Sequence, residues 1–179
     1  MRRGVDIRDV GSRNMGGANV MREIGAREGV FVGLFDIAKG AGAILIAQAL
    51  NVPELWVFGA GFAALAGHNF PVFAGFRGGR GSATVLGIFL VLAPWATLIA
   101  LVVVAIPFLT SRKCMGSIMI VFALLPVFLW LLEGSPELVY YALIIDLFML
   151  VRNVPGIRQL LAKGIIKDMM GDRNRKKLQ

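Results

Sequence analysis

The sequence has little of what soluble enzymes and metal proteins are usually built from. It contains one cysteine and one histidine in 179 residues, so an internal disulfide and a zinc site built on cysteine or histidine clusters are excluded. Charged residues make up only 17% of the chain, whereas 57% of it is apolar. This balance excludes a disordered chain and does not fit a water-soluble domain.

Acidic residues are also scarce relative to basic ones. The chain has 19 Lys and Arg against 11 Asp and Glu, which gives a net charge of +8. An excess of this size indicates a polyanionic or anionic-membrane partner. A nucleic-acid partner is not expected, because a DNA-binding domain needs a soluble core and none is visible. The first 27 residues are polar and Arg-rich, without the apolar segment of a signal peptide.

What the sequence has instead is long apolar runs. Residues 29–50 match a hydrocarbon core about 30 Å thick at about 1.5 Å per residue, and residues 55–73 form a second span. Two shorter runs, 118–132 and 138–151, lie near the C-terminus. We therefore expect an all-α polytopic membrane protein with about six transmembrane or partly spanning helices, forming a single integral membrane domain over residues 1–179.

The apolar run 83–109 is interrupted by Pro94 and allows two interpretations, one tilted helix or a hairpin of two short helices. Charge placement favours the hairpin. With a hairpin, every loop that contains Lys or Arg lies on one side of the membrane. The charged residues of the opposite loops are then only Glu54, Glu133 and Glu137. Since basic loops are typical of the cytoplasmic side, we expect both termini in the cytoplasm.

The C-terminal tail, residues 156–179, also has two interpretations. Its apolar residues recur as in an amphipathic helix and its end is rich in Lys and Arg, which suits a basic cytoplasmic helix held against anionic headgroups. A frayed, solvated tail is the alternative.

The predicted cytoplasmic loop 1–27 contains an unusual motif, GSRNMGGANVMR, from Gly11 to Arg22. Glycines expose successive backbone N–H groups, and short hydroxyl and amide side chains add donors, so such a loop is able to wrap an oxyanion. An ordinary flexible polar loop is the alternative. The candidate residues are Ser12, Asn14, Gly16, Asn19 and Arg22.

A second glycine-rich segment, residues 67–84, leads directly into the next apolar run. Backbone N–H groups, the positive end of a helix dipole and an arginine would then surround one point, which is a suitable seat for a phosphate. The spacing is not that of a Walker loop, and a plain turn between membrane helices is the alternative. The candidate residues are Gly78, Gly79, Arg80, Gly81 and Thr84.

Three ionisable candidates fall in or beside the first two predicted spans. Asp36 and Lys39 are three residues apart and share a helix face, and charges at that depth are costly unless they are paired or face a polar pocket. We expect them to contribute to substrate binding, with a structural neutral pair as the alternative. His68 joins the substrate-binding candidates, although a lone histidine in such a place is more often a packing residue.

At these segments the sequence resembles the bacterial acyl-phosphate-dependent glycerol-3-phosphate acyltransferases of the PlsY type. The first segment follows the family motif GSGNxGATNxxR, with departures at Arg13, Gly17 and Ala18. The second, GHNFPVFAGFRGGRGSAT, follows GHxFPVFxxFxGGKGxAT, except that Arg80 replaces a lysine. The pattern Asp-x-x-Lys-Gly is met in the intervening helix by Asp36, Lys39 and Gly40.

The resemblance implies acyl transfer from acyl phosphate to the 1-hydroxyl of glycerol 3-phosphate, giving lysophosphatidate at the cytoplasmic face of the cell membrane, without coenzyme A, metal or another cofactor. It implies that Ser12, Arg22 and Arg80 are the catalytic residues, the first two orienting substrate phosphates. Arg80 and its neighbouring glycines would hold the glycerol phosphate. Because an acyl phosphate is already activated, positioning and charge neutralisation are what the reaction requires.

Three departures from the family pattern keep other functions open. Arg80 replaces a compact ammonium with a planar fork. The family's third motif has no histidine here, although Asn153 stands near its place, and the helix that usually precedes the first motif is missing from this sequence. The alternatives are a divergent relative with another acyl acceptor or donor, and a noncatalytic lipid-phosphate-binding or transport protein.

Overall fold

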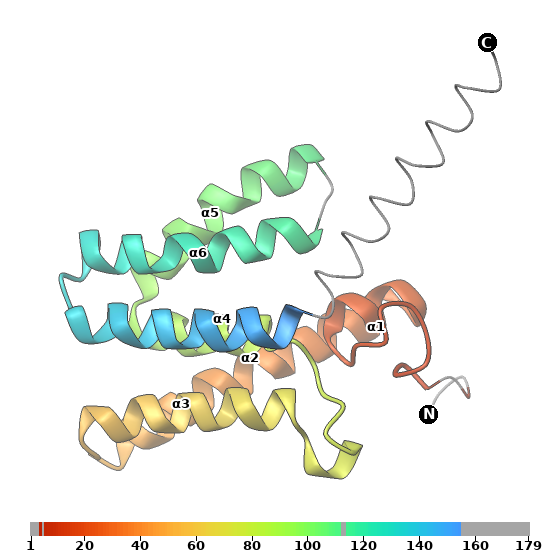
Figure 1. Ribbon diagram of the computed structural model, residues 1–179, viewed down its shortest axis with the longest axis horizontal. Coiled ribbons are helices and arrows are strands. Elements are labelled where there is room, and N and C mark those ends of the chain that lie inside the picture. The colour runs from red at the N-terminus through yellow and green to blue at the C-terminus, as the bar shows by residue number, and fades with distance from the viewer. Residues whose placement is uncertain (1–3, 5, 112–113, 155–179) are drawn as a thin grey trace. The chain divides into compact units, whose positions relative to one another are not determined.

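The computed structural model describes residues 4, 6–111 and 114–154, with side chains outside 104–122. This part of the chain is helical and contains no strand (Figure 1). The elements are α1 Gly17–Glu23, α2 Ala26–Ala49, α3 Glu54–Asn69, the 3-10 helix η1 Val72–Ala74, α4 Ser82–Leu92, α5 Pro94–Ser111 and α6 Cys114–Leu132. Residues 136–154 form a further helix, within which the boundary between two compact units, Met1–Asp146 and Leu147–Gln179, falls.

Two of the described helical segments are long and apolar enough to cross a membrane. They are α2, with 24 residues, and the 21-residue segment 54–74, which joins α3 to η1. The apolar helices 82–92, 94–103 and 123–132 are shorter. Large apolar side chains such as Phe31 and Trp56 are exposed on the outer faces of α2 and α3. Exposed apolar surface on this scale needs lipid to cover it, which confirms the prediction of an all-α membrane protein.

The run containing Pro94 is a pair of helices, as the charge placement predicted. Helix α4 ends at Leu92, Ala93 has a non-helical backbone conformation, and α5 begins at Pro94, so the chain reverses there (Figure 1). The buried hydroxyl of Thr97 lies 2.8 Å from the Ala93 carbonyl oxygen and 3.0 Å from that of Phe89. Both carbonyl groups also accept a backbone N–H, that of Phe89 from Ala93 and that of Ala93 from Thr97, so the hydroxyl is a second donor that joins the start of α5 to the end of α4.

Helices α2 and α4 approach each other closely because glycines face the opposing backbone. A Cβ at Gly40 of α2 would overlap the Thr84 carbonyl oxygen, and a Cβ at Gly87 of α4 would overlap that of Ile37. Small residues allow such contact between membrane helices. The first turn of α4 is therefore held directly against the middle of α2.

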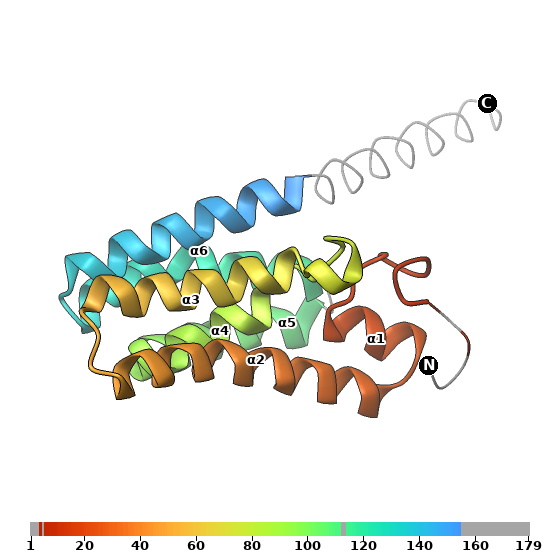
Figure 2. The ribbon, with the colours of Figure 1, turned by 90° about the horizontal axis from the view of Figure 1, so that it is seen from below.

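The second half of the first motif is helical, so the prediction of a loop throughout 1–27 is wrong for α1. Helix α1 packs on the start of α2 (Figure 2). A Cβ at Gly17 would lie 2.6 Å from the Gly29 carbonyl oxygen and 3.0 Å from the Gly33 nitrogen. Gly17 departs from the family motif at a position where this chain has no room for a side chain, which explains why α1 can settle there.

In the C-terminal unit, the described residues 147–154 continue the last helix. The Asn153 side chain donates a hydrogen bond from Nδ2 to the Met149 carbonyl oxygen at 2.7 Å. The predicted amphipathic tail 156–179 lies outside the described residues.

Candidate functional site

The first motif is organised around the buried side chain of Asn19. Its Nδ2 lies within hydrogen-bonding distance of three carbonyl oxygens, of Ile7 at 3.3 Å, Val10 at 3.2 Å and Asn14 at 2.9 Å. Its Oδ1 accepts a hydrogen bond from the Ser12 backbone N–H at 2.9 Å. Both ends of the amide are therefore turned towards the loop backbone, and Asn19 holds the shape of the loop that carries Ser12.

The other candidates of the first motif lie around this amide. Gly11 has a φ of +60°, and a Cβ there would overlap Asn19 Oδ1, so a glycine is required. The Asn14 Oδ1 accepts a hydrogen bond from the Gly16 N–H at 3.1 Å, just before α1 begins. The side chains of Ser12 and Arg22 are exposed. The structure thus gathers the predicted residues in one loop and in α1, which follows it, and leaves the Ser12 hydroxyl and the Arg22 guanidinium open to solvent.

The glycines of the second motif close the loop onto the end of α3. The Gly78 N–H donates to the Asn69 carbonyl oxygen and the Gly79 N–H to that of His68, both at 3.2 Å. These two N–H groups are occupied by carbonyl groups at the end of α3. Gly78 and Gly79 therefore shape the loop, and an anion has to be bound by other donors.

Those donors lie at the start of α4. Gly81 precedes the helix with a φ of +87° and has no side chain to cap it, so the first N–H groups of α4 lack helical partners. Arg80 is half-buried next to them, and Thr84 is fully buried in the first turn. Backbone donors, a positive helix end and a guanidinium thus meet at the N-terminus of α4, which is the arrangement that binds phosphate in many proteins.

Asp36, Lys39 and His68 form one cluster, in which the side chains of Asp36 and His68 are buried and that of Lys39 is partly exposed. The Lys39 Nζ lies 2.6 Å from Asp36 Oδ1 and 2.6 Å from His68 Nδ1, and the imidazole Nδ1 is 3.2 Å from the same carboxylate oxygen. When Lys39 donates to Nδ1, the imidazole is neutral and carries its proton on Nε2. A Cβ at Gly79 would overlap that Nε2, so the imidazole ring lies directly against the loop of the second motif. The cluster supports the loop from α2 and α3.

Two buried polar side chains close to this cluster have no hydrogen-bond partner within the described part of the chain. They are the amide of Asn69, next to His68, and the hydroxyl of Thr84. Thr84 was expected at the site from its place in the second motif, whereas sequence reasoning gave Asn69 no role. Its only signal is its position between the histidine and the proline of that motif.

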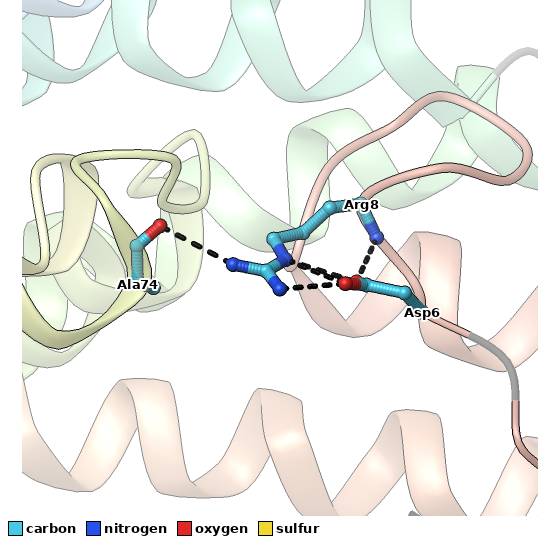
Figure 3. A network of polar contacts seen from close by, with 3 residues as sticks. All are labelled: Asp6, Arg8 and Ala74. Atoms are coloured by element: carbon cyan, nitrogen blue, oxygen red, sulfur yellow. Dashed lines mark hydrogen bonds and ion pairs between the residues drawn. The ribbon is translucent and has the colours of Figure 1, made fainter.

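Sequence reasoning also missed Asp6 and Arg8, which precede the first motif. The Arg8 guanidinium binds both oxygens of Asp6, and its Nη1 donates to the Ala74 carbonyl oxygen of η1 at 3.4 Å (Figure 3). The hydrogen bond from the Arg8 side chain lowers the pKa of Asp6 to about 2 from its ordinary 3.8. The available signal was the Asp-x-Arg spacing, which allows a carboxylate to accept from a backbone N–H two residues later.

Membrane-length helices and a charged cluster around the buried Asp36 define an integral-membrane protein, and the positive terminus of α4 suits a small anion. The model of the family described as glycerol-3-phosphate acyltransferase matches residues 1–163. The chain belongs to the glycerol-3-phosphate acyltransferase family. This confirms the resemblance inferred from the two motifs.

Curated relatives support the same assignment. The chain is 40% identical over 158 residues to the glycerol-3-phosphate acyltransferase of Geobacter sulfurreducens, covering 88% of this chain and 81% of that protein. It is 42% identical over 159 residues to the enzyme of the same name from Geobacter metallireducens, covering 89% and 82%.

Two solved structures share the fold. Crystal structures of PlsY, described as an integral membrane glycerol 3-phosphate acyltransferase, match in the glycerol 3-phosphate form with a TM-score of 0.81 and 31% identity. That match covers 89% of this chain and 80% of the other. The lysophosphatidic acid form matches with a TM-score of 0.76 and 29% identity, covering 85% and 78%.

Proposed function

We propose that this protein transfers a fatty acyl group from acyl phosphate to the 1-hydroxyl of glycerol 3-phosphate at the cytoplasmic face of the cell membrane. The hydroxyl oxygen forms the new ester bond to the acyl carbon, and the bond from that carbon to the phosphate oxygen breaks. The products are lysophosphatidate and inorganic phosphate, which takes up the hydroxyl proton in the overall balance.

One observation on this protein's own structure supports the proposal independently of its relatives. The N-terminus of α4 combines unoccupied helical N–H groups with Arg80, and α4 is held tightly against α2 by Gly40 and Gly87. A rigid group of donors is what an acyl transfer from an activated donor needs, since positioning and oxyanion stabilisation supply most of the barrier reduction. The match to PlsY in its glycerol 3-phosphate form supports glycerol 3-phosphate as the acceptor.

The residues then divide into two sets. Ser12 and Arg22, exposed on the first motif, orient substrate phosphates, and Arg80 with the first turn of α4 holds the phosphate of glycerol 3-phosphate. Asn19 and the two glycines 78 and 79 act by fixing the loops.

The test uses purified protein in lipid nanodiscs with acyl phosphate and glycerol 3-phosphate, following both inorganic phosphate and lysophosphatidate. Ser12→Ala and Arg80→Ala should each lower turnover by about 10²-fold or more, the usual range for a lost transition-state donor. Arg27→Ala removes an exposed cation outside both motifs and should leave the rate unchanged. Near-normal rates in both motif variants would refute the assignment.

Arg80 in place of the family's lysine favours a second candidate, a relative with another polyol-phosphate acceptor. A planar guanidinium binds two phosphate oxygens at once, and it places its charge differently from an ammonium group. A turnover assay that offers several polyol phosphates with one acyl donor distinguishes these two candidate functions. Binding of glycerol 3-phosphate by calorimetry without phosphate release would instead favour a noncatalytic binder.

The cytoplasmic location of the site is tested by accessibility. Single cysteines introduced near Ser12 and near Gly79, in a variant in which Cys114 is replaced by serine, should both react with an impermeant thiol reagent from the cytoplasmic side only. Labelling of the two positions from opposite sides of the membrane would refute a common site.

A further inference from the structure

The two motif loops come from distant parts of the chain, and something has to fix the distance between them. The first loop is attached to α1 and the second lies between α3 and α4. Arg8, just before the first motif, and Ala74, within the second segment, are 66 residues apart in sequence and joined by a hydrogen bond. This contact lies outside the residues that bind substrate in the proposed function.

The geometry of the contact depends on a guanidinium. Arg8 Nε lies 2.9 Å and 3.0 Å from the two carboxylate oxygens of Asp6, and Nη2 lies 2.6 Å from the second of them. The Arg8 backbone N–H also donates to Asp6 at 2.9 Å, so the turn holds the pair in place. With two nitrogens bound to Asp6, the remaining Nη1 points at the Ala74 carbonyl oxygen (Figure 3).

The turn between Ala74 and Arg77 is also connected to Asp6 and Arg8. The Ala74 carbonyl oxygen also accepts the Arg77 backbone N–H at 3.3 Å, so it closes the turn that leads towards the glycines of the second motif. The positive charge of Arg77 adds to the effect of Arg8 in lowering the pKa of Asp6. Asp6 therefore lies within the electrostatic reach of both loops.

We propose that Asp6 and Arg8 form a positioning pair that fixes the second loop against the first, so that Ser12 and Arg80 act on one pair of bound substrates. This inference rests on the proposed function. Neither residue contacts a reacting atom in it. Arg8 acts through the Ala74 carbonyl group, and Asp6 acts by aiming Arg8.

The kinetic consequence is specific. Each loop still binds its own phosphate when the pair is lost, so KM for both substrates should stay within about threefold. The reacting groups lose their alignment, and a misplacement of about 1 Å is able to cost about 10²-fold in rate. We therefore expect kcat to fall by about 10-fold to 100-fold in Arg8→Gln and in Asp6→Asn, and by no more in the double variant, because both changes break one unit.

Two further variants separate positioning from charge and from folding. Arg8→Lys keeps the charge next to Asp6 without the planar fork, so its kcat should lie closer to Arg8→Gln than to wild type. Asp9→Asn removes an exposed carboxylate from the same turn, changes the net charge as Asp6→Asn does, and should retain wild-type kcat.

A readout that needs no activity completes the experiment. Limited trypsin cleavage after the exposed Arg77, quantified by mass spectrometry on the protein in nanodiscs, reports release of the second loop. Cleavage should be several times faster in Asp6→Asn and in Arg8→Gln than in wild type and in Asp9→Asn. Faster cleavage together with lower kcat at constant KM supports the proposal.

Other results would refute the positioning role, and one result would refute only the proposed acyl transfer. Unchanged kcat in Arg8→Gln, or an equal loss in Asp9→Asn, overturns the positioning role. Lower kcat with unchanged cleavage also overturns it, because the loop has then not been released. If wild-type protein shows no transfer while cleavage still depends on Arg8, the proposed function fails and the contact between the loops stands.

Discussion

Replacing Gly40 by alanine tests the close contact between α2 and α4. The added methyl group would overlap the Thr84 carbonyl oxygen and lie 3.0 Å from the Thr84 carbonyl carbon. A backbone oxygen cannot rotate away as a flexible side chain can. The two helices therefore have to separate, and the first turn of α4 moves with them.

The expected magnitude follows from two opposing effects. Overpacking of a tight contact costs about 1–3 kcal/mol. Alanine in a helix interior recovers about 0.5–1 kcal/mol relative to glycine through backbone entropy. Gly42, on the same helix, provides the matched control, because no described atom lies within 4 Å of a Cβ built there. Gly40→Ala should therefore be less stable than Gly42→Ala by about 1–3 kcal/mol, since the helix-propensity gain cancels between them.

The assay compares thermal unfolding and phosphate release for wild type and the two variants in the same nanodiscs. Gly42→Ala should match wild type or exceed it slightly in stability and retain full turnover. Gly40→Ala should lose stability and also turnover, because the end of α4 that we propose binds phosphate is displaced. Equal stability and equal rates in the two variants would refute the reasoning that the glycine contact positions the site.

Three other predictions concern the polar groups. Asn19→Leu should lower stability by about 1–3 kcal/mol, because it leaves the Ser12 N–H and the loop carbonyl groups without their partner. Asn19→Asp keeps an acceptor for the Ser12 N–H but turns a carboxylate oxygen towards the loop carbonyl oxygens, so it should not recover this loss in thermal unfolding. Lys39→Met leaves the buried Asp36 carboxylate without its cation and should destabilise the protein more than the double variant Lys39→Met with Asp36→Asn. Because the pKa of Asp6 is lowered to about 2, its contribution is complete above its ordinary 3.8 and is lost only as the pH falls towards 2. The ratio of wild-type to Asp6→Asn turnover in a pH-rate profile should therefore be constant from about pH 5 to pH 8.

The spans and the break at Pro94 were predictable from sequence because both follow from local properties. The length of an apolar run determines whether a helix can cross the membrane. Proline has no N–H to donate within a helix, so a run that contains one is interrupted there and a new helix begins. The sign of the charges in the loops favoured the hairpin over one tilted helix, and the side of the membrane on which each loop lies stays a prediction. These rules need no knowledge of which residues meet in space.

The site was predictable only in part, because its residues act through contacts that the sequence does not display. The motif located Gly78 and Gly79, but only the structure shows that their N–H groups are occupied by the end of α3. Asn19 looked like a ligand and turns its amide towards the loop backbone instead. The contact between Arg8 and Ala74 could not be predicted from the sequence. Arg8 binds a backbone carbonyl group, and every residue has one, so the type of residue at position 74 gives no indication of it.

The short helix α4 has a consequence for how the protein enters the bilayer during synthesis. With 11 residues it extends about 16 Å, roughly half of a hydrocarbon core about 30 Å thick. What α4 lacks for insertion is length, and α5, which begins at Pro94, is the next apolar helix that the chain supplies. We expect nascent chains arrested before α5 to leave α4 outside the lipid, so that the first turn of α4 takes its place against α2 only after α5 has been made.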